Sequence, residues 1–253
     1  MKILILDDAA AASARAAGLI AAQLAAKPDT VLGLATGGTM EAVYERLIAL
    51  HREGGASFAR AQSFNLDEYV GLAGDHPCSY RHYMAEKLFD HIDIPADAAH
   101  LPVGEAADPE AEAARYEAEI VAAGDIDLQL LGLGLNGHIG FNEPTSSLTS
   151  ITRLKTLERS TREANSRYFP DGEAPPRLAI TMGIGTIMRA REVLLVATGA
   201  AKAPAVAQVI EGPVSARWPG SILQMHRHAT LILDRAAASE LELLDYYLDV
   251  HPD

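Results

Sequence analysis

Short apolar runs alternate with helical patterns along almost the whole chain. An expected strand over Lys2–Leu6 precedes an Ala-rich helix over Ala9–Ala26, and a strand over Thr30–Ala35 precedes a helix that begins near Met40. Strands that alternate with helices form a largely parallel sheet covered by helices on both faces. The sequence therefore predicts an α/β fold with an open, mostly parallel, doubly wound sheet of the Rossmann-like kind.

The same alternation continues to the C-terminus. No repeat, low-complexity tract or linker interrupts it, and 253 residues suit one large α/β domain, so we expect residues 1–253 to form a single domain. Further strands are expected over 61–66, 126–131, 151–157, 178–182, 192–197 and 230–233, and further helices over 79–90, 109–122, from about 201, and over 239–248.

Charge and cysteine content narrow the partners and the location. A net charge of −13 argues against a nucleic-acid or anionic-membrane surface, so an anionic ligand would need a local positive site. Cys78 is the single cysteine, which excludes an intrachain disulfide and predicts a free, buried thiol in a reducing cytoplasm. The apolar run at the N-terminus is too short for a signal sequence or a membrane span.

Two glycine-bearing loops lie where an expected strand runs into a helix. Gly37, Gly38 and Thr39 precede one helix, whose N-terminus offers free N–H donors and a partial positive charge suited to phosphate. Gly199 and Lys202 repeat the arrangement, and a bound anion would relieve the unfavourable position of a lysine near a helix start. A plain tight turn and a solvated lysine are the alternatives, but the two loops together favour a phosphate site.

Titratable side chains follow two other expected strands. Asp67 comes directly after the third strand, and a partly buried carboxylate there can have its pKa raised toward that of a working base. The segment Gly132–Pro144 carries His138 and Glu143, and a carboxylate near a histidine can hold its tautomer and stabilise its cation. A helix cap or solvated acidic pair is the alternative for Asp67, and a core or capping histidine for His138.

Three other kinds of site are not supported. The glycines of the segment match the dinucleotide-binding spacing, but they do not open a βαβ unit, and Pro144 breaks the helix that should follow. The nine histidines are scattered, and His226 and His228 have the wrong spacing for two ligands on one helix face, so no metal site is predicted. No serine lies in a Gly-x-Ser-x-Gly nucleophile elbow.

Five motifs spread over nearly the whole chain resemble the glucosamine-6-phosphate deaminase family. The run Gly-His-Ile-Gly-Phe-Asn-Glu-Pro is specific, because the wider superfamily, which includes 6-phosphogluconolactonase, shares the glycine loop and histidine but not this continuation. The motifs are Thr36–Thr39, Asn65–Tyr69, Gly132–Pro144, Thr161–Arg167 and Thr181–Gly185.

The resemblance implies conversion of glucosamine 6-phosphate to fructose 6-phosphate and ammonia, in amino-sugar (N-acetylglucosamine) catabolism. It implies His138 as the ring-opening base, Glu143 as the group that orients and tunes it, and Asp67 as the base that moves the C2 proton. It implies neither a metal nor an organic cofactor. The implied phosphate ligands are the amides of Gly37, Gly38 and Thr39 and the side chains of Arg167 and Lys202.

Asn136 stands where many members of the family carry aspartate. A carboxamide cannot relay a proton as a base, so we expect it to hold His138 or a substrate hydroxyl by hydrogen bonds. Ser146, Arg153 and Lys155 match a second sugar-phosphate site that allosteric members have near a subunit interface. A homo-oligomer stays open, but the chain ends without the longer tail of the regulated enzymes, so neither regulation nor their hexamer is expected.

Three other functions stay open beside the deaminase. They are lactone hydrolysis as in 6-phosphogluconolactonase, deamination of galactosamine 6-phosphate, and a sugar-phosphate sensor without turnover. The presence of Asp67, His138 and Glu143 together argues against the sensor, because binding alone would not need that trio.

Overall fold

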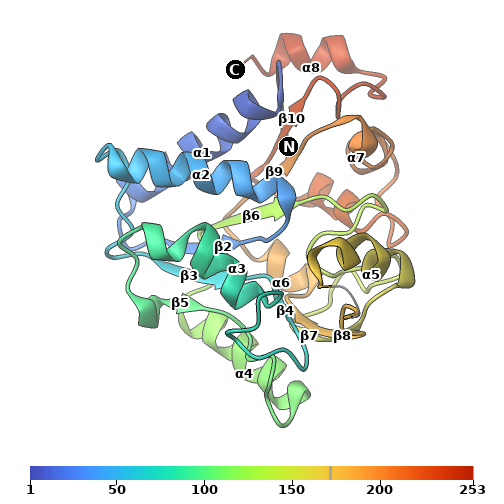
Figure 1. Cartoon of the computed structure of the whole chain (residues 1–253). Helices are drawn as coiled ribbons and strands as arrows, with labels where there is room; N and C mark the ends of the chain where they lie inside the picture. The colour runs from blue at the N-terminus through green and yellow to red at the C-terminus, as the bar shows by residue number, and fades with distance from the viewer. Residues whose placement is uncertain (171–172, 253) are drawn as a thin grey trace.

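The computed structural model describes residues 1–170 and 173–252 and contains a seven-stranded sheet whose strand pairs are all parallel (Figure 1). The strand order is β1-β10-β9-β6-β2-β3-β5. Helices cover both sides of this sheet, so the predicted α/β fold is confirmed. The strands are β1 (Lys2–Leu6), β2 (Val31–Leu34), β3 (Gln62–Asn65), β5 (Ala99–His100), β6 (Leu128–Gly132), β9 (Glu192–Ala197) and β10 (Ala229–Asp234).

Most helices connect one strand of the sheet to the next. Figure 1 shows α1 and α2 side by side and α4 at the opposite end of the molecule. The helices are α1 (Ala9–Ala26), α2 (Gly38–Arg52), α3 (Tyr80–Lys87), α4 (Pro109–Ala122), α5 (Arg159–Asn165), α6 (Ile184–Met188), α7 (Ala203–Ile210) and α8 (Leu244–Val250).

Helix α1 shows how local sequence and burial act together. Asp8 caps it by accepting a hydrogen bond from the amide of Ala11 at 2.8 Å. Within the described residues, α1 is the one helix long and apolar enough to cross a membrane by length and composition, with a mean hydropathy of 1.3. Its buried face, which includes Ala16, Ile20 and Leu24, packs instead in the core between α2 and the sheet.

A second, antiparallel sheet corrects part of the expected strand pattern. β8 (Leu178–Thr181) pairs with β4 (Asp67–Tyr69) on one side and with β7 (Arg153–Thr156) on the other. The strands expected over 151–157 and 178–182 therefore exist, but they lie outside the parallel sheet, and Asp67 begins a new strand. Apolar periodicity reports that a segment is extended and buried, whereas it does not report which strand it pairs with.

The last helix begins later than the pattern over 239–248 predicts. The amides of Glu242 and Leu243 donate hydrogen bonds to the carboxylate of Glu211 at 2.8 and 2.9 Å. Ala237 donates to the Asp234 carboxylate in the same connection. These contacts with residues outside the helix hold the connection in turns, and α8 starts only at Leu244.

Candidate active site

Three of the four loops expected to carry the site leave neighbouring strands of the parallel sheet. β6 lies between β9 and β2, and all three run in the same direction. Their carboxyl ends therefore meet at one edge, where α/β sheets bind ligands. The loop after β2 leads to Gly37, the loop after β6 to His138 and the loop after β9 to Gly199.

The imidazole of His138 lies against Gly134. A Cβ atom at Gly134 would stand 2.2 Å from Cε1 and 2.3 Å from Nδ1 of His138, so only glycine leaves room for the ring. The Gly134 amide donates to the His138 carbonyl at 2.9 Å, and Gly137 turns the chain with a φ of +78°. Gly134 therefore leaves space for the His138 ring, and Gly137 allows the tight turn between them.

Asn136 connects His138 to Glu143. Its amide nitrogen donates to Glu143 Oε2 at 2.9 Å, and its Oδ1 lies 2.6 Å from His138 Nδ1. Because Asn136 Oδ1 can only accept, His138 Nδ1 carries the proton and Nε2 keeps its lone pair. Glu143 Oε2 lies 3.8 Å from His138 Nδ1, so the carboxylate acts on the ring chiefly through the carboxamide.

The electrostatic surroundings keep His138 neutral. Burial lowers the pKa of His138, the Glu143 carboxylate opposes this, and the Lys202 ammonium lowers it further. Glu143 is 4% exposed, and its Oε1 has no hydrogen-bond partner in the described part of the chain. A neutral ring with an available Nε2 can accept a proton, and the buried carboxylate can stabilise the resulting cation.

Asp67 is a buried carboxylate on the opposite side of the same loop. It is 5% exposed, and its Oδ2 accepts a hydrogen bond from Thr181 Oγ1 at 3.3 Å. Burial raises the pKa of Asp67 to about 7, and the Glu68 charge adds to the rise, while hydrogen bonds from Thr181 and Phe141 oppose it. A Cβ at Gly140 would lie 3.4 Å from Asp67 Oδ2, so the loop that carries His138 also contacts Asp67.

Aromatic side chains account for the burial of Asp67. Tyr69, Tyr80, Phe141 and Phe169 form a cluster with ring centroids 4.9 to 5.9 Å apart. The Asp67 charge raises the pKa of both Tyr69 and Tyr80, after the larger effect of their burial, which shows that the two phenols lie near the carboxylate.

The N-terminus of α2 is free to accept an anion. Gly37 is its N-cap, with a φ of +112°, and among the described residues no side chain is seen to cap the helix. Thr39 lies in the first turn, and a Cβ at Gly38 would stand 3.5 Å from the hydroxyl of Tyr168. Arg167 donates to that same hydroxyl at 2.8 Å, so its guanidinium lies near this helix start.

Lys202 brings a second cation toward the loop of His138. Its Nζ donates to the Leu133 carbonyl at 2.6 Å, and burial lowers its pKa, with a further contribution from the charge of Arg167. Among the described residues, neither Arg167 nor Lys202 forms an ion pair with a carboxylate. The structure therefore places two cations, neither paired with a carboxylate of the described residues, near the N-terminus of α2 and His138.

The residues expected to form a second sugar-phosphate site lie near Glu143. Arg153 and Lys155 are two residues apart on β7 and so share one face of that strand. Burial lowers the pKa of both, and the Glu143 charge partly opposes the shift at Lys155. Ser146 is buried, its amide donates to the Glu143 carbonyl at 3.0 Å, and its hydroxyl has no hydrogen-bond partner in the described residues.

Sequence reasoning missed three residues that support this site. Thr181 donates to Asp67 from β8, Glu158 accepts from Asn136 at 3.2 Å, and Trp218 packs against Gly137. Thr181 stood inside a motif already used for the family resemblance, so its position was visible but not its role. Nothing near Glu158 or Trp218 in the sequence points to a loop so distant along the chain.

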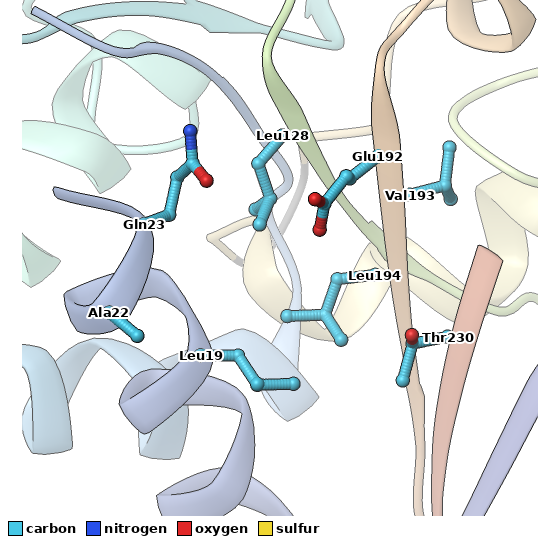
Figure 2. A pocket seen from close by; sticks show the side chains of 8 residues that line it. All are labelled: Leu19, Ala22, Gln23, Leu128, Glu192, Val193, Leu194 and Thr230. Atoms are coloured by element: carbon cyan, nitrogen blue, oxygen red, sulfur yellow. The ribbon is translucent and has the colours of Figure 1, made fainter. Parts of the chain in front are cut away.

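A cavity of about 250 Å³ lies away from the ligand loops (Figure 2). Leu128 and Glu192, the first residues of β6 and β9, and Thr230, the second residue of β10, line it together with Leu19 and Gln23 from α1. It therefore opens at the amino end of the strands, opposite the edge that carries Gly37, His138 and Gly199.

Fold and site define an α/β enzyme of the sugar-phosphate isomerase class. The family model "Glucosamine-6-phosphate isomerases/6-phosphogluconolactonase" matches residues 7–232, and the chain belongs to this family. The glucosamine-6-phosphate deaminase of Shewanella loihica is 53% identical over 253 residues, covering 100% of this chain and 94% of the relative. That of Cellvibrio japonicus is 54% identical over 249 residues, covering 98% and 94%.

Solved structures agree with this assignment. A monomeric glucosamine-6-phosphate deaminase superposes with a TM-score of 0.93 at 46% identity, covering 95% of this chain and all of the other. The 6-phosphogluconolactonase of Trypanosoma cruzi superposes with a TM-score of 0.76 at 22% identity, covering 95% of this chain and 97% of the other, which shows the shared fold alone. The family resemblance drawn from the five motifs is confirmed.

Proposed function

We propose that this chain is a glucosamine-6-phosphate deaminase, which isomerises and deaminates glucosamine 6-phosphate to fructose 6-phosphate and ammonia. The observation that carries the proposal is that Asp67, whose pKa is raised to about 7, contacts the loop that carries neutral His138. The cations of Lys202 and Arg167, neither of which pairs with a carboxylate among the described residues, lie nearby. Relatives named for this activity, which align along the full chain, support it.

Ring opening is assigned to His138. Its Nε2 takes the proton from the anomeric hydroxyl, the bond between C1 and the ring oxygen breaks, and the ring oxygen receives a proton. Asn136 holds Nδ1–H in place, and the Glu143 carboxylate stabilises the transient imidazolium through it. The result is the open-chain aldehyde with its amino group at C2.

Proton transfer between carbons is assigned to Asp67. Its carboxylate takes the C2 proton to form an enolamine and returns a proton to C1, which leaves an imine at C2. Water adds to C2 and ammonia leaves, so the products are fructose 6-phosphate and ammonia. A carboxylate with a pKa of about 7 is a stronger base than an exposed aspartate, and about half of it is ionised at neutral pH.

The phosphate of the substrate is assigned to the amides of Gly37, Gly38 and Thr39 together with Arg167 and Lys202. A free helix N-terminus and two cations suit a dianionic group. Binding this remote group positions the reacting carbons and contributes to the rate.

Replacing Lys202 with alanine is expected to raise KM about 10- to 100-fold, because a charge-assisted hydrogen bond to the phosphate is lost. The same change removes a charge that lowers the pKa of His138, so that pKa should rise. Steady-state kinetics over a range of pH measure both effects. Lys87→Ala, at a lysine paired with Glu86 on the surface, is the control. An unchanged KM in Lys202→Ala would contradict the assignment.

Replacing Asn136 with aspartate is expected to keep turnover within about tenfold, because one acceptor for His138 Nδ1–H replaces another. The added charge should raise the pKa of His138 and move the acid limb of the rate profile to higher pH. Asn136→Leu has neither acceptor nor donor and should lose far more activity. Equal activity in the leucine variant would show that Asn136 does not hold His138.

The proposed activity is tested by incubating the protein with glucosamine 6-phosphate and following ammonia and fructose 6-phosphate. Galactosamine 6-phosphate and 6-phosphogluconolactone serve as competing substrates in parallel assays. No product from glucosamine 6-phosphate, together with hydrolysis of the lactone, would replace the deaminase with the lactonase. Tight binding without product from any of the three would indicate a sensor.

We further propose that residues 1–253 act as one domain, located in the cytoplasm. Asp67 and Thr181 belong to the small sheet, whereas His138 lies in the loop after β6 of the large sheet, and this loop contacts Asp67 at Gly140. Cys78 is free and buried, which suits a reducing compartment.

Ser146, Arg153 and Lys155 are proposed as a second sugar-phosphate site, supported by two half-buried cations and a buried hydroxyl without a partner in the described chain. Light scattering with and without a non-reacting phosphorylated sugar tests this site and any homo-oligomer together. Loss of the ligand's effect in Arg153→Ala would support the assignment.

A further inference from the structure

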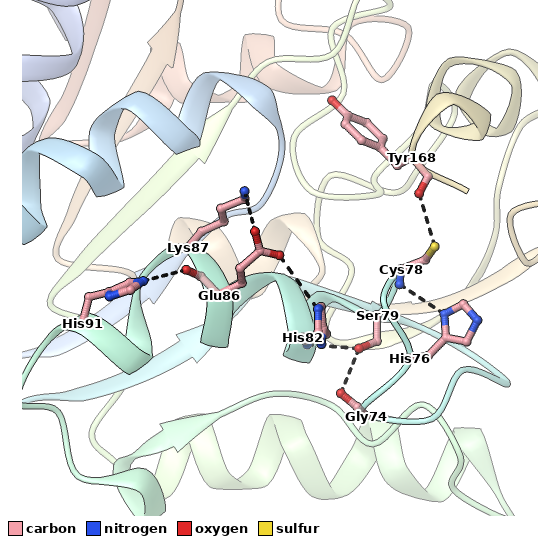
Figure 3. A network of polar contacts seen from close by, with 9 residues as sticks. All are labelled: Gly74, His76, Cys78, Ser79, His82, Glu86, Lys87, His91 and Tyr168. Atoms are coloured by element: carbon pink, nitrogen blue, oxygen red, sulfur yellow. Dashed lines mark hydrogen bonds and ion pairs between the residues drawn. The ribbon is translucent and has the colours of Figure 1, made fainter. Parts of the chain in front are cut away.

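Three metal-ligating side chains meet outside the catalytic loops. His76 and Cys78 precede α3, and Glu173 follows the segment that carries Arg167. One donor atom from each lies within 4.8 Å of the other two, and His76 Nε2 is 3.3 Å from Glu173 Oε2. Figure 3 shows His76 and Cys78 side by side below Tyr168. We propose that His76, Cys78 and Glu173 bind a divalent transition-metal ion, with Zn²⁺ as the best match.

The donor set suits such an ion. A thiolate, an imidazole and a carboxylate are the three ligand types that proteins offer to Zn²⁺, and three protein ligands leave a fourth position for water. Bond lengths of about 2.0 to 2.3 Å place tetrahedral donors about 3.3 to 3.8 Å apart. The His76–Glu173 pair already has this separation. Glu173 is exposed, so its side chain can rotate to close the remaining distances.

Metal binding would break hydrogen bonds of His76 and Cys78 and release one proton. The Cys78 thiol donates to the Tyr168 carbonyl at 3.3 Å, and His76 Nδ1 accepts from the Cys78 amide at 3.1 Å. Ligation through Nε2 moves the ring proton to Nδ1 and breaks the second bond, without a net change in protons on the ring. The thiol loses one proton to solvent and becomes the thiolate ligand. Metal affinity should therefore rise with pH.

A divalent ion pairs with the Cys78 thiolate and the Glu173 carboxylate at once, which offsets the repulsion between these two negative ligands.

The site would restrain the segment that carries a proposed phosphate ligand. Glu173 follows Arg167 along the same connection, and the carbonyl of Tyr168 contacts Cys78. The Arg167 guanidinium lies 4.8 Å from the centre of the Tyr168 ring. Metal bound at Cys78 would hold this segment at one position, so KM should change more than kcat. This effect on kinetics rests on the proposed function, whereas metal binding itself does not.

A neighbouring pair offers a matched control. His82 and Glu86 lie one turn apart on α3, with His82 Nε2 3.8 Å from Glu86 Oε2 and no thiol in the pair (Figure 3). They supply the same imidazole and carboxylate a short distance from the proposed site. If Co²⁺ bound wherever a histidine lies near a glutamate, changing His82 and Glu86 would weaken binding as much as changing His76 and Glu173.

The test is a Co²⁺ titration of the full, metal-free chain, followed by near-ultraviolet absorption from sulfur-to-cobalt charge transfer. We expect saturation at one equivalent and competition by Zn²⁺. Cys78→Ser should abolish the band, and Glu173→Gln, at an exposed position that leaves folding intact, should weaken binding at least about tenfold. His82→Gln and Glu86→Gln should bind as the parent does.

Absence of a charge-transfer band at one equivalent would overturn the metal site, and so would parental affinity in Glu173→Gln. Circular dichroism of each variant shows whether it is folded. Absorption reports metal binding independently of turnover. A protein that binds Co²⁺ but does not release ammonia would contradict the proposed deaminase activity and support the metal site. A protein that releases ammonia but does not bind Co²⁺ would contradict the metal site and support the deaminase.

Discussion

Asp67→Asn is expected to lower turnover by about 10²- to 10⁴-fold, the range that a general base contributes. The carboxamide keeps the shape of the side chain and cannot take the C2 proton. Binding should change little, because the proposed phosphate ligands lie on other loops. Exchange of the C2 proton with solvent deuterium, followed by NMR, measures the step directly, and a phosphorylated inhibitor measures binding. Normal exchange in the variant would remove Asp67 as the base.

The same substitution has a predicted effect on pH dependence. Because the ionised form of Asp67 is the base, kcat/KM of the parent should fall as the pH drops below about 7. The free energy of unfolding should change with pH in the opposite direction from kcat/KM. The folded state holds a proton on Asp67 that the unfolded state has already lost above its ordinary value of 3.8, so this group makes the protein less stable as the pH rises from about 4 through 7. Asp67→Asn should lack that decline, as denaturant titrations at several pH values would show.

Asp127 is a suitable control, because it is also a buried carboxylate but its pKa is shifted in the opposite direction from that of Asp67. Burial raises its pKa, but hydrogen bonds from Lys27 and the Val31 amide outweigh this and leave the pKa below the ordinary value. Asp127→Asn should therefore destabilise the protein at neutral pH and leave C2 exchange per folded molecule unchanged. If both variants lost exchange equally, the effect of Asp67 would be one of folding and not of chemistry.

Gly134→Ala is expected to lower kcat by about 10²-fold, the cost of a displacement near 1 Å at a reacting group. Its Cβ would stand 2.2 Å from His138 Cε1, so the ring must leave its place against the loop. The hydrogen bond from His138 Nδ1 to Asn136 Oδ1 would be lost with it. Activity is measured with glucosamine 6-phosphate, and the His138 ring signals in NMR report the displacement.

Gly18→Ala is the matched control for this change. Gly18 lies inside α1, and apart from the helix's own backbone and the adjacent residues, no atom of the described chain comes within 4 Å of a Cβ built there. The substitution should leave activity unchanged and stabilise the protein by about 0.5 to 1 kcal/mol, because alanine loses less backbone entropy in a helix. Full activity in Gly134→Ala would mean that the ring of His138 has more freedom than its contacts indicate.

The structure also shows where sequence reasoning was limited. The alternation of strands and helices predicted the parallel sheet, yet it did not reveal that segments 151–157 and 178–182 pair in a separate antiparallel sheet. The spacing of histidines along the chain also could not show that Glu173 approaches His76 and Cys78. Pairing between distant segments depends on the packing of the whole chain, which a local pattern does not contain.

Local sequence patterns were sufficient to predict the α/β class, which the structure confirms, and they point to the loops after β2, β6 and β9 as places for a ligand, which stays a prediction. These follow from local rules, since apolar runs form strands, and loops at the carboxyl ends of parallel strands share one edge. Tertiary structure alone decided the protonation of the site. Asn136 stands between His138 and Glu143, and burial raises the pKa of Asp67, because desolvation depends on side chains brought together from distant positions.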